Sequence, residues 1–448
     1  MQTRNFVTAL FIAVSATCAF AQVPETINQE VVVPGPIPVP QKKTLDVGGE
    51  ARFRFEALDN RDFNSTTNDR HDFIGSRIRL NVLLSPTYTL EAFIQPQISG
   101  VWGQIDSTTS GSGVVTGGIP TSGGLQDPKL SLHQGYVTWK FLDDASLKIG
   151  RQELSYGDHV VLGNLNYSNV ARSFDAGLIR LTQNNNRFDL FYSKLAENDV
   201  VGSGLSGNDD FAGIYATLSP PSMFTELDVY GLWLRRAKTG DPVTFNFGTF
   251  GTRFKYLSNS WNGRFEAALQ YGEHTAKTML AYMVDYEGGY TFDLKKGLNV
   301  TGEYNYASGD DATNGRFTRF HSLFPTAHRW LGLMDFFGRQ NIQSGVMHLA
   351  LRWDDQWEFG TDLHSFWRTQ SSDILYGLTA ETAVAGQTLP TSSQLHAGEE
   401  LDLIVTYKPT ERIEFQALGG VFRPAGYIKS SIGNSLSYLS YMQATFKL

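Results

Sequence analysis

The stretch EARFRFEA, residues 50–57, places an apolar side chain at every second position. The positions between them hold charged side chains, namely Glu50, Arg52, Arg54 and Glu56. Successive side chains of a β-strand point to opposite faces of a sheet. The stretch therefore predicts a strand with one apolar and one polar face.

The same alternation returns along the chain. It is present in RIRLNVLL (77–84), GRFEAALQY (263–271), LNVTGEYNY (298–306), ELDLIVTY (400–407) and RIEFQALGG (412–420). Many of these strands run for about 10 residues, which is longer than a typical soluble strand and matches a tilted strand that crosses a bilayer. We count about 18 strands, and bacterial single-chain barrels have an even number.

The connections between these strands alternate in length. Short turns are predicted at 85–87, 143–145, 184–186, 219–222, 257–260, 294–297, 354–356 and 408–411. Longer connections are predicted at 58–72, 102–129, 155–172, 195–210, 236–246, 307–343, 368–397 and 423–434. A barrel inserted from the periplasm has tight turns inside and loops outside, whereas a soluble propeller or sandwich does not separate lengths in this way. The sequence predicts an all-β, transmembrane, antiparallel up-and-down barrel.

The start of the chain carries signals for export. Residues 1–21 combine Arg4, an apolar run and a small-x-small triplet that ends at Ala21, which is typical of a secretory signal peptide. A membrane anchor is the alternative, but the run is shorter than the roughly 20 residues of a spanning helix. Residues 22–44 contain several prolines, which fix φ and lack an amide hydrogen, so we expect an extended periplasmic linker before a barrel at 45–448.

The end of the chain also fits an outer-membrane barrel. In SYLSYMQATFKL (437–448), one face is apolar up to the terminal residue, Leu448. Such a last strand suits recognition by the barrel-assembly machinery, which we expect as a partner. An ordinary edge strand is the alternative.

The composition argues against several functional classes. Cys18, within the predicted signal peptide, is the only cysteine, so the mature chain has no disulfide and no thiolate metal site. The net charge is −8 and no basic tract is present, which argues against nucleic acid as a partner. No G-x-S-x-G, H-E-x-x-H or P-loop motif is present, so we expect neither an enzyme nor a cofactor. SGDDATNGR (308–316) lacks the EF-hand spacing and is interpreted as a loop turn.

Charged residues on the polar faces are not evenly mixed. If the apolar faces meet lipid, the polar faces line a lumen. The early strands and one middle strand contribute Arg52, Arg54, Arg77, Arg79, Lys140, Lys148, Arg253 and Lys255. The late strands contribute Glu303, Glu358, Asp362, Glu400, Asp402 and Glu414. The first set predicts a basic arc of the lumen and the second an acidic arc. Either the two arcs focus an electric field that selects ions by sign, or their charges pair and only rigidify the wall.

The stretch LKIGRQELSYGD (147–158) breaks the alternation. Leu147 and Ile149 mark one face as apolar, so regular continuation puts Arg151 and Glu153 on that face. An arginine that faces the middle of the bilayer costs roughly 2–4 kcal/mol. We therefore predict a β-bulge at Gly150 that turns Arg151 and Glu153 into the lumen, keeps Ile149, Leu154 and Tyr156 outside and leaves Gln152 facing outward.

Three blocks of sequence resemble the alginate export family of Gram-negative outer membranes. They are LKIGRQELSYGDHVVLGNLNYSNVARSFDA (147–176), YNYASGDDATNGRFTRFHSLFPTAHRWLGLMDFFGRQNI (304–342) and GEELDLIVTYKPTERIEFQALGGVFRPAGYI (398–428). The resemblance implies a monomeric 18-stranded barrel surrounded by outer-membrane lipid and lipopolysaccharide. It also implies that a periplasmic scaffold delivers a negatively charged uronate polysaccharide, which leaves through an arginine-rich lumen.

The resemblance also implies site residues. Arg151 and Arg172 are the arginines expected to meet an anionic substrate, with Glu153, Asp158 and Asp175 as acidic neighbours. Alternation alone, without the family, adds Arg52, Arg54, Arg77, Arg79 and Lys148. The leading hypothesis is passive export of an alginate-like polyuronate. A general porin, or a porin that admits small anions or sugars, is the alternative, and a structural or adhesive barrel is a third hypothesis.

Overall fold

The computed structural model describes residues 43–102, 129–196, 209–220, 224–236, 244–258, 260–292, 297–311, 313, 315–378, 383–384 and 392–448. The predicted signal peptide and nearly all of the predicted linker lie outside these residues. Among the residues described, no helix has the length and apolar character needed to cross a membrane.

Strands make up most of the described chain. They are β1 (Thr44–Asp59), β2 (His71–Ser85), β3 (Leu90–Trp102), β4 (Lys129–Lys140), β5 (Ala145–Gln152), β6 (Phe174–Gln183), β7 (Asn186–Ala196), β8 (Asp209–Leu218), β9 (Phe224–Arg236), β10 (Phe245–Leu257), β11 (Trp261–His274), β12 (Lys277–Phe292), β13 (Leu298–Ala307), β14 (Ile342–Arg352), β15 (Trp357–Trp367), β16 (His396–Thr410), β17 (Ile413–Pro424) and β18 (Ser437–Lys447). Two short helices are also present, the 3-10 helix η1 (Ala327–Arg329) and α1 (Gly426–Ser431).

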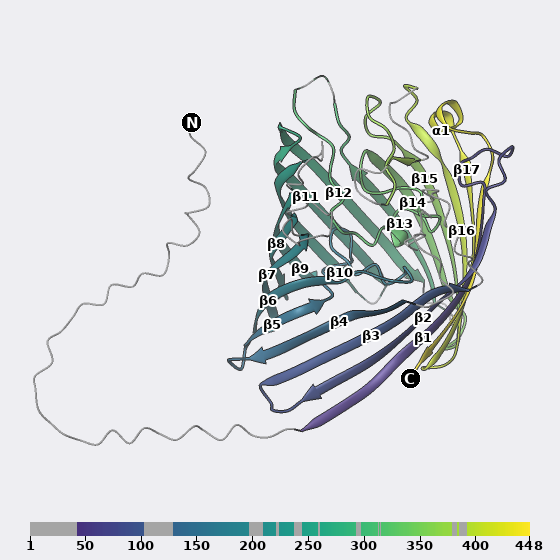
Figure 1. Cartoon of the computed structure of the whole chain (residues 1–448). Coiled ribbons are helices and arrows are strands. Elements are labelled where there is room, and N and C mark those ends of the chain that lie inside the picture. The colour runs from purple at the N-terminus through teal and green to yellow at the C-terminus, as the bar shows by residue number, and fades with distance from the viewer. Residues whose placement is uncertain are drawn as a thin grey trace, which may run out of the picture. The chain divides into compact units, whose positions relative to one another are not determined.

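The strands form one closed sheet (Figure 1). Each strand pairs antiparallel with the next, and β1 also pairs with β18, where Phe53 lies opposite Ala444. The predicted antiparallel barrel is confirmed, with 18 strands. Its outer face is apolar: on β12, Tyr282 and Tyr286 are exposed, whereas their neighbours Met283 and Asp285 are buried. An exposed apolar wall of this kind meets lipid, and the polar face lines the interior.

One connection has no clear signal in the sequence. β11 and β12 are joined by Thr275 and Ala276, at the barrel end where the other connections are long. Both residues have positive φ angles, 46° and 61°. Two-residue hairpin turns with positive φ usually contain Asn, Asp or Gly, and this turn contains none of the three. The sequence signals therefore predict no turn at this position, although the strand alternation on either side is correct.

The predicted β-bulge at Gly150 is wrong. Pairing continues without a register shift from β5 to both neighbours, with Gly150 opposite Tyr136 and Ala176. The nearby irregularity lies instead between β3 and β4, at Pro96. Proline has no amide hydrogen to donate to the ladder, and it is found in sheets at such irregular positions.

Regular pairing puts Arg151 on the outer face of β5, together with Ile149. The prediction that Arg151 points into the lumen is therefore wrong. Arg151 lies one residue before the strand ends and binds Asp175 of β6 through two hydrogen bonds of 2.8 and 2.7 Å. This bidentate partner neutralises the outward charge, so no bulge is needed to remove it from the outer face.

The rest of the motif also differs from the expectation. Gln152, predicted to face outward, is fully buried on the inner face and donates to the Ala176 carbonyl at 2.9 Å. Leu154 and Tyr156, predicted to face lipid, are buried as well. The reason is that β5 ends at Gln152 and the chain then turns inward, so strand alternation no longer applies to the residues that follow.

Gly150 is nevertheless special, and Gly150→Ala is expected to destabilise the barrel by about 1–3 kcal/mol. Its φ is +130°, and an added Cβ would lie 2.3 Å from the Gly135 carbonyl oxygen. Urea unfolding in lipid vesicles measures the effect. Gly177→Ala is the matched control, since a Cβ there meets nothing within 4 Å; it is expected to be neutral or slightly stabilising. Equal stability of the two variants would contradict the strain.

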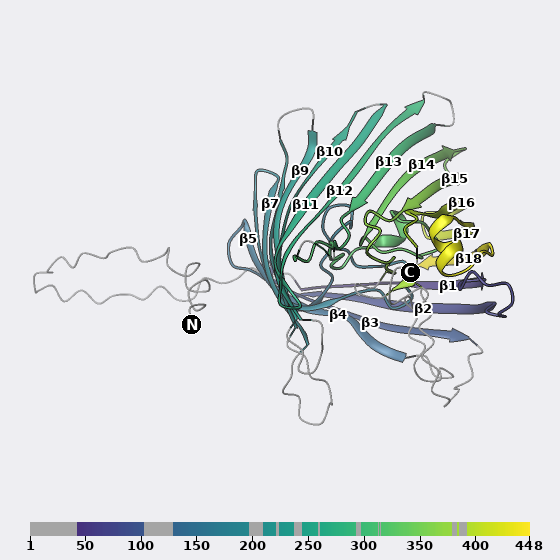
Figure 2. The same cartoon turned by 90° about the horizontal axis from the view of Figure 1, so that it is seen from above.

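Two long connections enter the barrel. The first lumenal loop (residues 153–173) joins β5 to β6, and the second lumenal loop (residues 315–341) contains η1 and leads into β14. Seen from above, chain segments with η1 lie inside the ring of strands (Figure 2). Their contacts with the inner wall determine which lumenal side chains remain accessible.

Candidate functional site

The first lumenal loop lies against the arginines of β1 and β2. Arg52 donates to the backbone carbonyls of Asn166 and Ser168, at 2.9 Å each. Arg77, directly opposite Arg52 in the sheet, donates to the same two carbonyls at 3.0 and 3.1 Å. Both arginine side chains are buried. Four hydrogen bonds from two guanidinium groups therefore hold this part of the loop backbone.

Arg54 and Arg79 complete this contact. Arg54 donates to the Tyr167 carbonyl at 3.0 Å, and its guanidinium lies 4.1 Å from the centre of the Tyr167 ring. Arg79 donates to the Asn166 side-chain oxygen at 2.9 Å and to Gln97 at 2.7 Å. Strand alternation brings the like charges of β1 and β2 together on the inner face. Ion pairs of Arg77 with Glu50 and of Arg54 with Glu56, together with the carbonyl dipoles of the loop, compensate their repulsion. The four predicted arginines thus lie on the inner face, covered by the loop.

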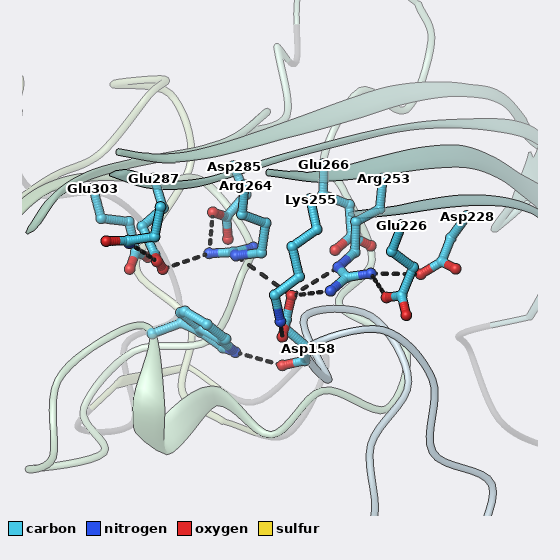
Figure 3. A network of polar contacts seen from close by, with 12 residues as sticks. Asp158, Glu226, Asp228, Arg253, Lys255, Arg264, Glu266, Asp285, Glu287 and Glu303 are labelled. Atoms are coloured by element: carbon cyan, nitrogen blue, oxygen red, sulfur yellow. Dashed lines mark hydrogen bonds and ion pairs between the residues drawn. The ribbon is translucent and has the colours of Figure 1, made fainter. Parts of the chain in front are cut away.

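Asp158 fastens the same loop to the opposite part of the wall (Figure 3). Arg253 donates to its carboxylate at 2.7 Å, and Lys255 and Arg264 lie 3.4 and 3.7 Å from it. Burial alone would raise the pKa of Asp158, but these three cations outweigh it and hold that pKa below its usual range. Asp158 therefore remains ionised at neutral pH and binds a cationic cluster that β10 and β11 place on the inner face.

The two lumenal loops bind each other. The Gly163 amide donates to the Phe324 carbonyl at 2.8 Å, and the Phe324 amide donates to the Val161 carbonyl at 3.1 Å. Trp330 donates from its indole nitrogen to the Asp158 carbonyl at 3.1 Å. The loops therefore form one body inside the barrel.

Arg172 lies at the junction of these loops. It donates to the carbonyls of Gly163 at 2.9 Å, Phe324 at 2.5 Å and Pro325 at 3.2 Å. Burial lowers the pKa of Arg172 to about 10, so its side chain is still charged at neutral pH. Its hydrogen bonds join the first loop to the second.

The second lumenal loop is held by carboxylates of β16. Glu400 accepts from the Met334 amide at 2.9 Å, and Asp402 accepts from the Leu333 amide at 3.3 Å. The loop backbone comes so close to Glu400 that position 332 requires glycine. Its φ is +88°, and an added Cβ would lie 2.5 Å from a Glu400 oxygen. The arginines of β1 and β2 thus bind loop carbonyls, and the two carboxylates of β16 bind loop amides.

The remaining predicted site residues are divided between the two faces. Glu153 lies inside, where His133 Nε2 is 2.8 Å from its carboxylate and Asn164 donates to it at 2.9 Å. Lys148 faces inward, with its ammonium 4.4 Å from the centre of the Tyr136 ring. Asp175 lies outside with Arg151, as described above.

A cavity of about 690 Å³ remains beside the two loops. Its wall residues come largely from the short-turn ends of β11 and β13–β17. Loop residues and charged wall residues both line it, among them Tyr167, His328, Arg329, Trp330, Glu287, Glu358, Asp362, Lys408 and Glu414. This lumenal cavity is the accessible part of the candidate site.

Arg329 is the loop arginine that sequence reasoning did not single out. It is exposed, lines the lumenal cavity and lies with its guanidinium 4.4 Å from the centre of the Trp330 ring. Among the residues that the structure describes, no carboxylate pairs with it. Arg329 lies within the second block that resembles the family, but no strand alternation extends to position 329, so its orientation had no signal in the sequence.

Further cations line the inner wall of β6, β7 and β10. Arg180, Arg187 and Lys255 have side chains that are 35%, 36% and 43% exposed, in contrast to the covered arginines of β1 and β2. We call Lys148, Arg180, Arg187 and Lys255 the cationic wall. Among the described residues, no group of His, Cys, Asp or Glu is arranged to hold a metal ion.

Comparison with known proteins gives a family and a fold. The model of the family described as "Alginate export" matches residues 43–441. No curated protein matches the chain. Among solved structures, Pseudomonas aeruginosa OccK2 (OpdF) in complex with glucuronate has a TM-score of 0.59 at 10% identity, covering 90% of this chain and 98% of that one. Acinetobacter baumannii OccAB1 has a TM-score of 0.60 at 12% identity, covering 90% and 97%. At such identities the similarity to solved structures shows the fold alone.

Proposed function

Because the chain belongs to the alginate export family of outer-membrane channels, we propose that it passes an anionic, alginate-like polysaccharide out of the periplasm. The observation that carries this proposal is Arg329, an exposed guanidinium inside the lumen that no described carboxylate neutralises. A guanidinium group binds a carboxylate through two parallel hydrogen bonds. Each uronate unit of such a polysaccharide presents a carboxylate.

The distribution of charge supports the same cargo. The cationic wall lies on β5–β7 and β10, whereas Glu287, Glu358, Asp362 and Glu414 line the lumenal cavity from the late strands. On the first side, carboxylates of a passing chain compete with Asp189 for Arg180 and Arg187 and with Asp158 for Lys255; the second side repels them. Because the cations are partly exposed to water, each contact is weak, and the polymer moves on from one to the next.

Arg329→Gln is expected to weaken block of the channel by oligouronates about ten- to hundredfold, because one hydrogen-bonded charge contact is worth about 1.5–3 kcal/mol. The measurement is the current through single channels of the purified protein in planar bilayers, titrated with oligouronates. Arg70→Gln is the matched control, since Arg70 lies in the connection between β1 and β2 with a side chain that is 67% exposed. Equal block in both variants, or equal block by neutral oligosaccharides, would count against the proposal.

Uptake of small anions is the second candidate. The observation that favours it is the filled lumen, since the cavity of about 690 Å³ lies within the about 300–1,000 Å³ of small-molecule sites. Swelling of proteoliposomes separates the candidates: entry of a monomeric sugar acid without entry of its oligomers supports uptake. Deletion of the gene with unchanged exopolysaccharide in the medium would also contradict export. Neighbouring polymerase and epimerase genes would favour export, and neighbouring catabolic genes would favour uptake.

The proposal extends to the ends and partners of the chain. It assigns residues 1–21 to a cleaved signal peptide and residues 22–44 to a periplasmic linker, largely outside the described residues. It also makes a periplasmic export scaffold the partner that delivers polymer to the barrel. Arg151 and Asp175 have no place in this path, because they lie on the outer face.

A further inference from the structure

The outer face of the barrel contains a trough with a bare floor. Gly263 of β11 lies opposite Gly288 of β12, which lies opposite Gly302 of β13. Each glycine lies two residues from an exposed aromatic residue on its own strand, as Gly288 does from Tyr286. Residues two apart point to the same face, so the three glycines face outward. Backbone without side chains therefore forms the surface across three adjacent strands.

Aromatic rows stand on both sides of this floor. On one side, Phe265, Tyr286 and Tyr304 lie opposite one another and are all exposed. On the other side, Trp261 lies opposite Tyr290, with ring centres 4.8 Å apart. The trough is therefore walled by rings and floored by backbone, a shape that lets a flexible chain make close contacts on three sides.

The trough continues across β14–β16 to β17. It passes Gly345, Met347, Leu363 and Leu401 and ends at Arg423, and the cavity volume is about 1480 Å³. This volume exceeds the about 300–1,000 Å³ of typical small-molecule sites. Because barrel strands are tilted, a trough that crosses them runs obliquely, from the short-turn end of β11 to the outer end of β17.

A cation lies at the outer end of the trough. The Arg423 side chain is 69% exposed, and its Nε atom is 3.3 Å from Glu399. Its two terminal nitrogens make no hydrogen bond to any residue that the structure describes. Glu399 thus orients the guanidinium and leaves its terminal nitrogens free to bind an anion, and phosphate is a preferred partner of this group.

We propose that the trough binds one molecule of the lipid A part of lipopolysaccharide, with an acyl chain over the glycine floor and a phosphate at Arg423. Membrane lipid surrounds the outer face of the barrel, and Arg423 lies at the end of β17 away from the short turns, on the side of the outer leaflet. The apolar trough matches acyl chains, and the cation matches the head group. The site lies outside the lumen, so its occupancy is independent of the cargo.

Native mass spectrometry of the purified barrel with diphosphoryl lipid A tests this proposal. Gly302→Leu is expected to lower the affinity for lipid A at least tenfold, because its side chain fills the floor. A Cβ at Gly302 meets nothing within 4 Å, and the gel mobility of unheated protein verifies that the variant barrel is closed. Gly177→Leu is the matched control, as an outward glycine of β6 opposite exposed Ile149 that is equally open. It is expected to leave lipid A binding unchanged.

Arg423→Gln tests the head-group contact. It is expected to remove the preference for diphosphoryl over dephosphorylated lipid A while chain binding persists. The proposal is overturned if Gly302→Leu binds lipid A as the unchanged protein does, or if Gly177→Leu loses as much affinity. It is also overturned if the unchanged protein is a dimer that Gly302→Leu converts to a monomer, since the trough would then be covered by a second copy.

Discussion

Replacing Arg253 with methionine is expected to lower the free energy of unfolding by about 3–5 kcal/mol, the usual effect of removing one partner from a buried ion pair. The Arg253 side chain is 1% exposed and lies within 2.7 Å of carboxylate oxygens of Asp158, Glu226 and Asp228 (Figure 3). Methionine keeps much of the side-chain length but none of the charge. Buried Asp228, partly buried Asp158 and more exposed Glu226 then lie close together without the cation between them.

Urea unfolding in lipid vesicles, followed by tryptophan fluorescence, measures this change. Arg235→Met is the matched control, because Arg235 has a side chain that is 41% exposed and lies 3.6 Å from Asp210. Exposed pairs of this kind contribute about 0.2–1 kcal/mol, so the control is expected to stay within that range. Adding Asp228→Asn to Arg253→Met is expected to recover part of the loss. Similar small effects of both arginine replacements would show that the cluster in Figure 3 does not stabilise the barrel.

Removing the first lumenal loop is expected to raise the single-channel conductance several-fold. Gln152 and Phe174 lie opposite each other at the ends of β5 and β6, so a two-residue Asn-Gly turn can replace residues 153–173. The deletion empties part of the lumen and removes the hydrogen bonds that hold the second loop at Phe324. It also uncovers the arginines of β1 and β2, so permeability to anions is expected to rise relative to cations.

Planar-bilayer recordings and reversal potentials in a salt gradient measure both effects, and the gel mobility of unheated protein verifies that the barrel is closed. Asp158→Asn is a smaller change that keeps the loop and removes only its carboxylate from Arg253. It is expected to increase current fluctuations without reaching the conductance of the deletion. An unchanged conductance after deletion of the loop would mean that ions pass elsewhere, and the proposed path along the cationic wall would be wrong.

The strands were predictable because their signal is local. In β1, alternation places Arg52 and Arg54 on the face opposite Phe53, and the structure has the same division. A strand between lipid and a polar interior must satisfy this pattern at each residue, so it is visible without knowledge of any distant contact. The same reasoning failed at Gly150, because it assumed that β5 continues to Tyr156 and that Arg151 has no partner.

The alternation of residues with period two determines the strands of the wall and the face on which most charges lie, and the alternation of short and long connections indicates a closed barrel. What fills the interior of the barrel depends on the tertiary structure. Arg52 binds carbonyls 114 and 116 positions away in the chain, and Arg172 binds a carbonyl 152 positions away. Loop backbone carries no periodic signal, and its position follows only from such distant contacts. For this reason the sequence indicates an arginine-bearing interior, whereas the folded chain decides that β1 and β2 use their arginines to hold a loop and that Arg329 remains accessible.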